Sequence, residues 1–283
     1  MTSTMPSTAS SPTHAVAGRA SVTPGFGPLA FAARAWFVAA AVGQGIFALY
    51  VLVFYGGAVV SGHPERWNDV LSRGHVPGDG VGNLVLGLHL LFAVQIIVGG
   101  IVQCLPAIRR RRPALHRWNG RLYMLSATTL ALGGLYLVWI RSGSAGDAVQ
   151  HAGVSLDALL ILVFAALSWR AARARRFEAH RRWALRLFLV VSGVWFFRIG
   201  LMLWILANRG PVGFDPETFS GPALNVIAFA QSLLPLAVLE LYFRGAAGGA
   251  GLRRVATVIL WLCVLATFAG IGAATMLLWW PRL

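Results

Sequence analysis

Four histidines occupy matching places in two halves of this 283-residue chain. His116 and His180 each lie just after a run of arginines, at the start of an apolar stretch. His89 lies 27 residues before His116, and His151 lies 29 residues before His180. Neutral imidazole is a common axial ligand of haem iron. Cysteine, methionine and tyrosine show no comparable pairing, so the four histidines are the residues best suited to redox chemistry.

The two histidine pairs belong to an internal repeat. Residues 111–123 align with residues 175–188 on their His-Arg dipeptides, with one extra residue after the second dipeptide. Fixed-period self-similarity of this kind indicates a repeated structural unit. At about 1.5 Å of rise per residue, a helical hairpin places His89 and His151 in one leaflet and His116 and His180 in the other. A bundle of the four helices would then hold two stacked b-type haems, one on each pair.

The elements that position these histidines are transmembrane helices. The chain is 57% hydrophobic and 12% charged, whereas soluble domains are about 25% charged. Runs of about 20 apolar residues, each long enough to cross a bilayer, recur along it. These features exclude a soluble globular domain, a disordered chain and a collagen-like repeat. The sequence predicts an all-α polytopic membrane protein, a bundle of seven spans at residues 29–55, 81–105, 118–140, 150–169, 183–207, 222–243 and 255–280.

The domain organisation follows from the same runs. Residues 1–28 are rich in Ser, Thr, Pro and Ala and have no charged region before an apolar stretch, so we predict a disordered tail and no cleaved signal. Residues 29–283 form the transmembrane helical domain. Within it, residues 81–207 contain spans two to five, which the repeat predicts to be a duplicated four-helix core. Spans one, six and seven flank that core.

Arginine sets the predicted orientation. All 24 basic residues are arginine, against nine acids, which gives a net charge of +15. The loops after spans two, four and six hold most of them, and such loops stay in the cytoplasm. We therefore expect a bacterial cytoplasmic (inner) membrane protein with a cytoplasmic N-terminus and an outer C-terminus. The arginines also predict contact with anionic lipid headgroups, and nucleic acid is excluded because no soluble domain is left to read it.

Two opposite charges lie inside the predicted spans. Arg198 lies in span five and Asp157 in span four, at similar depths. An unpaired charge in the bilayer is costly, so such residues usually have a partner and a role. The sequence predicts an in-membrane polar site in which Arg198 pairs with Asp157, with a haem propionate as the alternative partner of the arginine.

The segment from His89 to Arg198 resembles domain-of-unknown-function family 2306 of bacterial membrane proteins. The resemblance rests on His89, on the Arg-Arg-x-x-x-His-Arg-x-x-Gly-Arg-x-Tyr stretch ending at Tyr123, on the Glu-x-His-Arg-Arg-Trp stretch from Glu178, and on Arg198. It covers spans two to five, a little under half of the chain. It implies a membrane fold and no activity.

The histidine layout also looks like that of the two-haem transmembrane b-type cytochromes. That resemblance implies pairing of His89 with His151 and of His116 with His180. It also implies electron transfer across the membrane, with a quinol or another small redox partner as donor. The arginine-rich loops, and the position of His116 and His180 at the helix mouths, depart from that layout.

Two other functions remain open from the residues. One is a non-redox transporter or small-molecule-binding protein that uses Arg198, Asp157 and His89. The other is a structural or lipid-interacting protein, in which His116 and His180 only help to anchor helix ends at the headgroups.

Overall fold

The structure, a computed structural model, describes residues 27–71, 73–141 and 145–283. Residues 1–26, most of the predicted tail, lie outside the described part. The described chain is all-helical, apart from one isolated bridge between Asp215 and Ser220, which confirms the predicted class. Its elements are α1 (Pro28–Tyr50), the π-helix η1 (Val51–Gly56), α2 (Gly57–Val60), the 3-10 helix η2 (Pro64–Asp69), α3 (Gly80–Cys104), α4 (Pro106–Arg111), α5 (Pro113–Trp139), α6 (Ala148–Arg173), α7 (Phe177–Val191), α8 (Gly193–Asn208), α9 (Pro222–Ala247), α10 (Ala250–Ala274), the π-helix η3 (Thr275–Trp279) and the 3-10 helix η4 (Trp280–Arg282).

Six stretches of the described chain are single helices long and apolar enough to cross a membrane, and the bent pair α7–α8 makes a seventh. The predicted span at residues 183–207 corresponds to this pair, which bends by 51° between Val191 and Gly193. The hydroxyl of Ser192 donates to the Phe188 carbonyl and accepts from Nε2 of Gln44. A Ser-Gly pair and an inserted side chain are common causes of such a kink.

Several helices are longer than the predicted spans. The first continues through η1 to Val60, and the last runs from Ala250 to Arg282. Helix α5 begins at Pro113, five residues before the predicted span, with proline in its first turn where the missing amide costs nothing. His116 therefore lies inside the first turn of α5. In α5 and in the last helix the added residues include arginines, whose long side chains reach water from a helix end.

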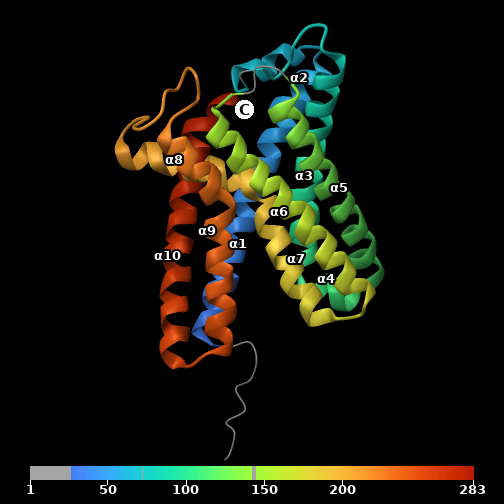
Figure 1. Cartoon of the computed structure of the whole chain (residues 1–283), viewed down its shortest axis with the longest axis vertical. Coiled ribbons are helices and arrows are strands. Elements are labelled where there is room, and N and C mark those ends of the chain that lie inside the picture. The colour runs from blue at the N-terminus through green and yellow to red at the C-terminus, as the bar shows by residue number, and fades with distance from the viewer. Residues whose placement is uncertain (1–26, 72, 142–144) are drawn as a thin grey trace, which may run out of the picture.

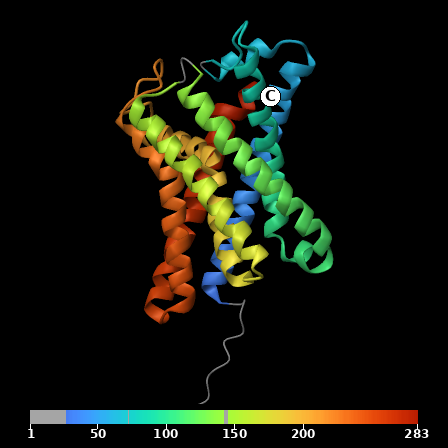
Figure 2. The same cartoon turned by 45° about the vertical axis from the view of Figure 1, so that its right-hand side comes forward.

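The helices form two groups (Figures 1 and 2). In the first, α3, α5, α6 and α7 pack one against the next in chain order. Their shared core contains Ile96, Ala127, Ile161 and Val190. In the second group α10 packs against α1, α8 and α9, and the two groups meet where α9 packs on α6 and where α1 packs on α3.

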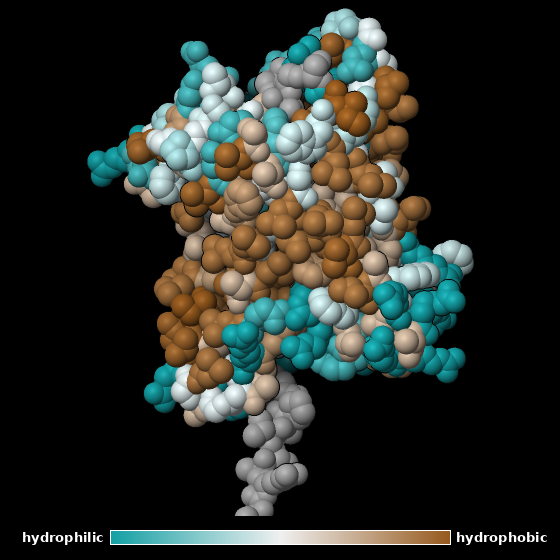
Figure 3. Space-filling view, in the orientation of Figure 1, coloured by the Kyte–Doolittle hydropathy of each residue, from teal (hydrophilic) through white to brown (hydrophobic). Residues whose placement is uncertain are grey.

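The surface divides into an apolar belt and two polar ends (Figure 3). Large apolar side chains on the helices are exposed, among them Met276, Leu125 and Val226, as expected for a surface that lipid covers. Helix α1 begins at the end where the loops after α3, α6 and α9 lie, and the C-terminus lies at the other end (Figure 1). We call these the arginine-rich end and the opposite end.

Candidate functional site

The histidines nearer the opposite end, His89 and His151, have different surroundings. A Cβ added at Gly133 would lie 3.7 Å from Nδ1 of His89, so this imidazole fits against a glycine pair of α5. His151 lies in the first turn of α6, where its Nε2 is 3.0 Å from the Ala145 carbonyl oxygen. Its ring packs edge-on against Trp139 at 5.7 Å. The contacts of both rings are thus with α5 and with the segment that joins α5 to α6.

The two histidines at the arginine-rich end are closer to the predicted arrangement. Nδ1 of His180 lies 3.1 Å from both the hydroxyl and the carbonyl oxygen of Ser168. Nδ1 of His116 is buried without a hydrogen-bond partner among the described residues, and the two imidazoles are near enough to interact electrostatically.

These contacts test whether the predicted haems would fit. Orientation of one ring nitrogen by a backbone oxygen, as at His180, is the usual state of a metal-binding imidazole, so the donor set of His116 and His180 is compatible with an iron. At the other pair Nε2 of His151 faces the Ala145 carbonyl oxygen in the same way, so the hydrogen bonds of the rings do not separate the two pairs, but their depths do. His89 lies nine residues into α3 but His151 only three into α6, an offset of about 9 Å along the helix axes.

Arg198 and Asp157 do not form the predicted ion pair. The guanidinium of Arg198 lies over the ring of Phe47, 5.2 Å from its centroid. Asp157 instead accepts a hydrogen bond from Ser232 and faces Gly193. Arg198 follows Gly193 by five residues, which turns it about 140° around α8 and moves it about 7.5 Å along the axis. A side chain at that position points away from the Asp157 carboxylate.

Arg198 belongs to a site that the sequence did not predict, built where the two π-helices meet. Tyr50, the last residue of α1, has its ring 6.3 Å from that of Trp279 in η3 and 5.8 Å from that of Tyr55 in η1. Phe47 packs on Trp279 at 5.4 Å. π-Helical turns are rare and often lie at functional sites. We call this cluster the aromatic donor site; its members are Phe47, Tyr50, Tyr55, Arg198 and Trp279, with His89 of α3 beside it through an electrostatic interaction with Arg198.

The buried polar atoms of the aromatic donor site have few partners. The side chains of Tyr50 and Trp279 are completely buried and that of Tyr55 is 2% exposed. Yet neither Nε1 of Trp279 nor Nδ1 of His89 has a hydrogen-bond partner among the described residues, and the hydroxyls of Tyr50 and Tyr55 have at most each other. Leaving one such buried group unpaired costs about 1–3 kcal/mol, and over 90% of buried polar groups are paired. Other buried side-chain atoms of the described chain share this state, among them Nε1 of Trp195, but those of Tyr50, Tyr55 and Trp279 lie together in one aromatic cluster.

The charge of the site is positive. Arg198 interacts electrostatically with both His89 and Tyr50, and Arg282 acts on Tyr50 as well. Among the described residues no carboxylate lies within ion-pair distance of Arg198; the acids that pair with cations are Glu65, Asp79, Glu178 and Glu240. Guanidinium and indole groups only donate hydrogen bonds. The site is therefore suited to a hydrogen-bond-accepting oxygen beside the aromatic cluster.

Little in the sequence pointed to this site. Its members come from α1, η1, α8 and η3, so more than two hundred residues separate Phe47 from Trp279. Only the in-span Arg198 and His89 stood out, because ionisable residues are rare in membrane helices. Aromatic residues near helix ends are so common in membrane proteins that Tyr50, Tyr55 and Trp279 carried no signal of their own.

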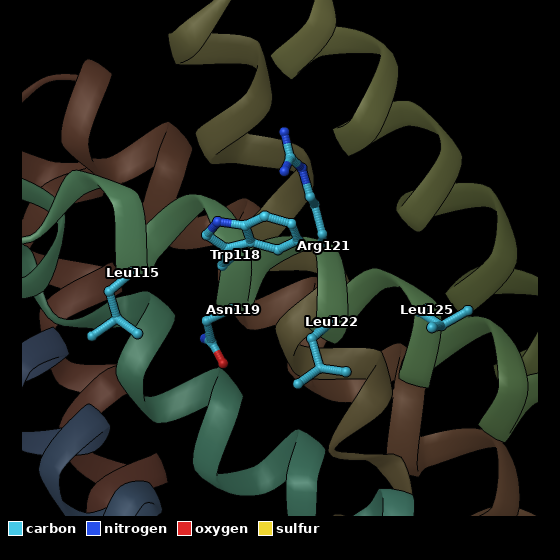
Figure 4. A pocket seen from close by; sticks show the side chains of 6 residues that line it. All are labelled: Leu115, Trp118, Asn119, Arg121, Leu122 and Leu125. Carbon is cyan, nitrogen blue, oxygen red and sulfur yellow. The ribbon is translucent and has the colours of Figure 1, made fainter.

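A second feature is a shallow hollow on the outside of α5 near the arginine-rich end (Figure 4). It is lined by Leu115, Trp118, Asn119, Arg121, Leu122 and Leu125. Trp118 is 68% exposed, and the guanidinium of Arg121 lies 4.8 Å from the centroid of its ring. An apolar surface beside an indole and a guanidinium suits a lipid with an anionic headgroup.

Comparison with known proteins gives one match. The model of a family described as "Predicted membrane protein (DUF2306)" matches residues 86–242, from the middle of α3 almost to the end of α9. No curated protein and no solved structure matches the chain. The matched region contains His89 and Arg198, while Tyr50 and Trp279 lie outside it.

Proposed function

The chain belongs to the DUF2306 family of predicted membrane proteins, and on that premise we propose that this multi-pass protein is a small-molecule-binding membrane protein. Its ligand is an apolar molecule with an oxygen-bearing head, held in the aromatic donor site. The observation that carries the proposal is the cluster of buried polar atoms on Tyr50, Tyr55 and Trp279, which have no hydrogen-bond partner outside the cluster among the described residues.

The chemistry of the site specifies the head group. Arg198, Trp279 and the two phenols offer donors, so the ligand must supply acceptors. Two kinds of membrane-soluble molecule do so: a quinone, through its carbonyl oxygens, and a fatty carboxylate, through its charged oxygens. The rings of Phe47, Tyr50 and Trp279 already contact one another, with centroids 5.4–6.3 Å apart, so binding of either molecule requires these side chains to move apart.

The test is ligand-dependent thermal stabilisation of the detergent-purified protein. A short-tailed naphthoquinone and a fatty acid are the probes, and the fatty alcohol of equal length is the control for the tail. A ligand that binds only the folded state raises the melting temperature in proportion to its concentration over Kd. Stabilisation by the quinone or the acid, but not by the alcohol, is expected, and it identifies the head group.

Single substitutions test whether the ligand binds in the aromatic donor site. Tyr50→Phe and Trp279→Phe each remove one donor and should weaken binding by about threefold to tenfold, the worth of one net hydrogen bond. Tyr123→Phe is the matched control, because Tyr123 is an equally buried tyrosine in the core of the other helix group. Equal affinity in wild type, Tyr50→Phe and Trp279→Phe would refute the site.

Haem binding is the second candidate, and the matching depths of His116 in α5 and His180 in α7 favour it at that pair. His180 is oriented by Ser168, and the buried Nδ1 of His116 has no partner among the described residues. A b-type haem there would make the protein an electron carrier. Oxidised and reduced visible spectra after expression with ample haem decide this: a b-type spectrum that His116→Ala abolishes and His151→Ala leaves supports it, and absence of the spectrum eliminates it.

We also infer the placement of the protein in the cytoplasmic membrane, with the arginine-rich end inside. The support is the concentration of arginine in the loops after α3, α6 and α9. In this orientation the hollow at Trp118 and Arg121 lies at the level of the inner headgroups, where anionic lipids are its partners. The aromatic donor site then lies in the outer half of the bilayer.

A further inference from the structure

Two carboxylates lie well inside the spanning helices, and their surroundings differ. Glu240 of α9 accepts a hydrogen bond of 2.7 Å from Nε of Arg186 in α7. Arg186 in turn lies over the ring of Trp183, at 4.5 Å. Asp157 of α6 is 7% exposed, and within the described residues it makes no ion pair and one side-chain hydrogen bond, with Ser232 of α9. Only one of the two acids therefore has a cation.

We propose that Asp157 is a proton-binding site, a neutral carboxylic acid held inside the membrane at the break between α7 and α8. An isolated ionised carboxylate in an apolar interior costs far more than a hydrogen bond repays, and such a group takes up a proton instead. The hydroxyl of Ser232 can serve the acid as donor or acceptor. The proposal does not depend on a ligand in the aromatic donor site.

The absence of a side chain at Gly193 leaves room for the Asp157 carboxyl group at the break. A Cβ added at Gly193, the first residue of α8, would lie 2.6 Å from Oδ2 of Asp157 and 3.0 Å from its Cγ. The glycine therefore lets the carboxyl group reach the break. The N-cap residue Ser192 makes no side-chain bond to α8, because its hydroxyl bonds back to Phe188. The start of α8 thus faces Asp157 and has no cap of its own.

The charged groups on the surrounding helices are engaged elsewhere. On α8, Arg198 lies over Phe47. On α9, Glu240 pairs with Arg186 of α7. On α6 itself, His151 contacts Ala145. On α5, the arginines Arg117 and Arg121 lie at the arginine-rich end, and Arg121 lies over Trp118.

A proton at this position has a mechanical consequence. The positive end of the α8 dipole attracts a negative charge within its first turn, so loss of the proton strengthens the contact between Asp157 and the start of α8. Gain of the proton weakens that contact and loosens the bend. Because α8 also carries Arg198, the protonation of Asp157 and the position of Arg198 are linked through one helix.

Infrared difference spectroscopy of the purified protein in lipid tests the proposal. A protonated carboxylic acid has a carbonyl stretch above the amide band that moves on deuteration, whereas a carboxylate absorbs well below it. The spectrum of wild type minus Asp157→Asn at neutral pH should show the acid band. The matched control, wild type minus Glu240→Gln, should show carboxylate bands. Carboxylate bands in the Asp157 difference, or no acid band there, would overturn the proposal.

A second variant keeps the test decisive if Asp157→Asn folds poorly. Ser232→Ala retains the acid and removes its hydrogen bond, so the same band should persist at a higher frequency. A band that Ser232→Ala leaves unmoved does not belong to Asp157 and refutes the assignment. Folding of each variant is checked by its size-exclusion profile.

Discussion

At the scale of single residues, some polar groups stabilise the fold through hydrogen bonds, whereas others have few or no hydrogen-bond partners. Arg141 is of the stabilising kind. Its side chain is 8% exposed, its Nε donates to Asp79 at 2.9 Å, and its guanidinium also donates to the side-chain oxygen of Asn83 at 2.8 Å. Asp79 also caps α3 by accepting from the amide of Gly82. These contacts tie the loop before α3 to the end of α5. In the aromatic donor site, by contrast, the tyrosine and tryptophan side chains have no hydrogen-bond acceptor outside the cluster among the described residues.

The Asp79 cluster predicts acid sensitivity. The Gly82 amide above all, and then Arg141, hold the pKa of Asp79 below its usual range. A carboxyl whose pKa is lower in the folded state stabilises the fold above its unfolded pKa, about 3.9, and this contribution is lost as the pH falls through the lower folded value. Asp79→Ala should lower the melting temperature by a few degrees at neutral pH and flatten its decline in acid. The exposed Asp69→Ala is the control, and an equal effect of both changes would contradict the assignment.

At the scale of elements, close helix packing depends on a few glycines. A Cβ added at Gly270 of α10 would lie 2.9 Å from the carbonyl oxygen of Ile199 in α8. Small residues at such places let two helix backbones approach in a membrane. The bend at Ser192 matters here, because it turns α8 away from the course of α7.

Substitution of that glycine should separate α8 from α10. Gly270→Ala forces a backbone to move, and overpacking of this kind costs about 1–3 kcal/mol. Gly272→Ala, in the same helix, is the control because nothing lies within 4 Å of the added Cβ. Thermal unfolding monitored by circular dichroism should show a lower melting temperature for the first variant only. Equal stability of both variants would mean that α8 and α10 are not in backbone contact.

At the scale of the whole molecule, the concentration of arginine at one end predicts which end faces the cytoplasm, and this orientation can be tested. In a variant whose two cysteines, Cys104 and Cys263, are replaced by alanine, a single cysteine is placed in an exposed loop. Ser61→Cys lies near the opposite end, and Ala174→Cys lies between α6 and α7. A membrane-impermeant maleimide should label the first in intact cells and the second only after permeabilisation. The reverse pattern would invert the proposed orientation.

Much of the architecture was readable without coordinates, since the length and apolar content of each segment are local properties. The fold class was confirmed, the described chain has six or seven candidate spans against the seven predicted, and the family resemblance was confirmed by the match to residues 86–242. The break at Ser192 was missed because residues 183–207 are mostly apolar on both sides of it, and hydropathy does not register a hydrogen bond from Ser192 to Phe188. The π-helices were missed for the same reason.

Which polar groups meet was decided by the tertiary structure alone. The sequence indicated that Arg198, Asp157 and the four histidines matter, because ionisable side chains in a membrane are costly wherever they lie. Their partners depend on the rotation of each helix about its axis and on the bend between α7 and α8. That bend directs Gly193 to Asp157 and Arg198 to Phe47. Tyr50 and Trp279, from opposite ends of the chain, become neighbours only because α1 and α10 pack together.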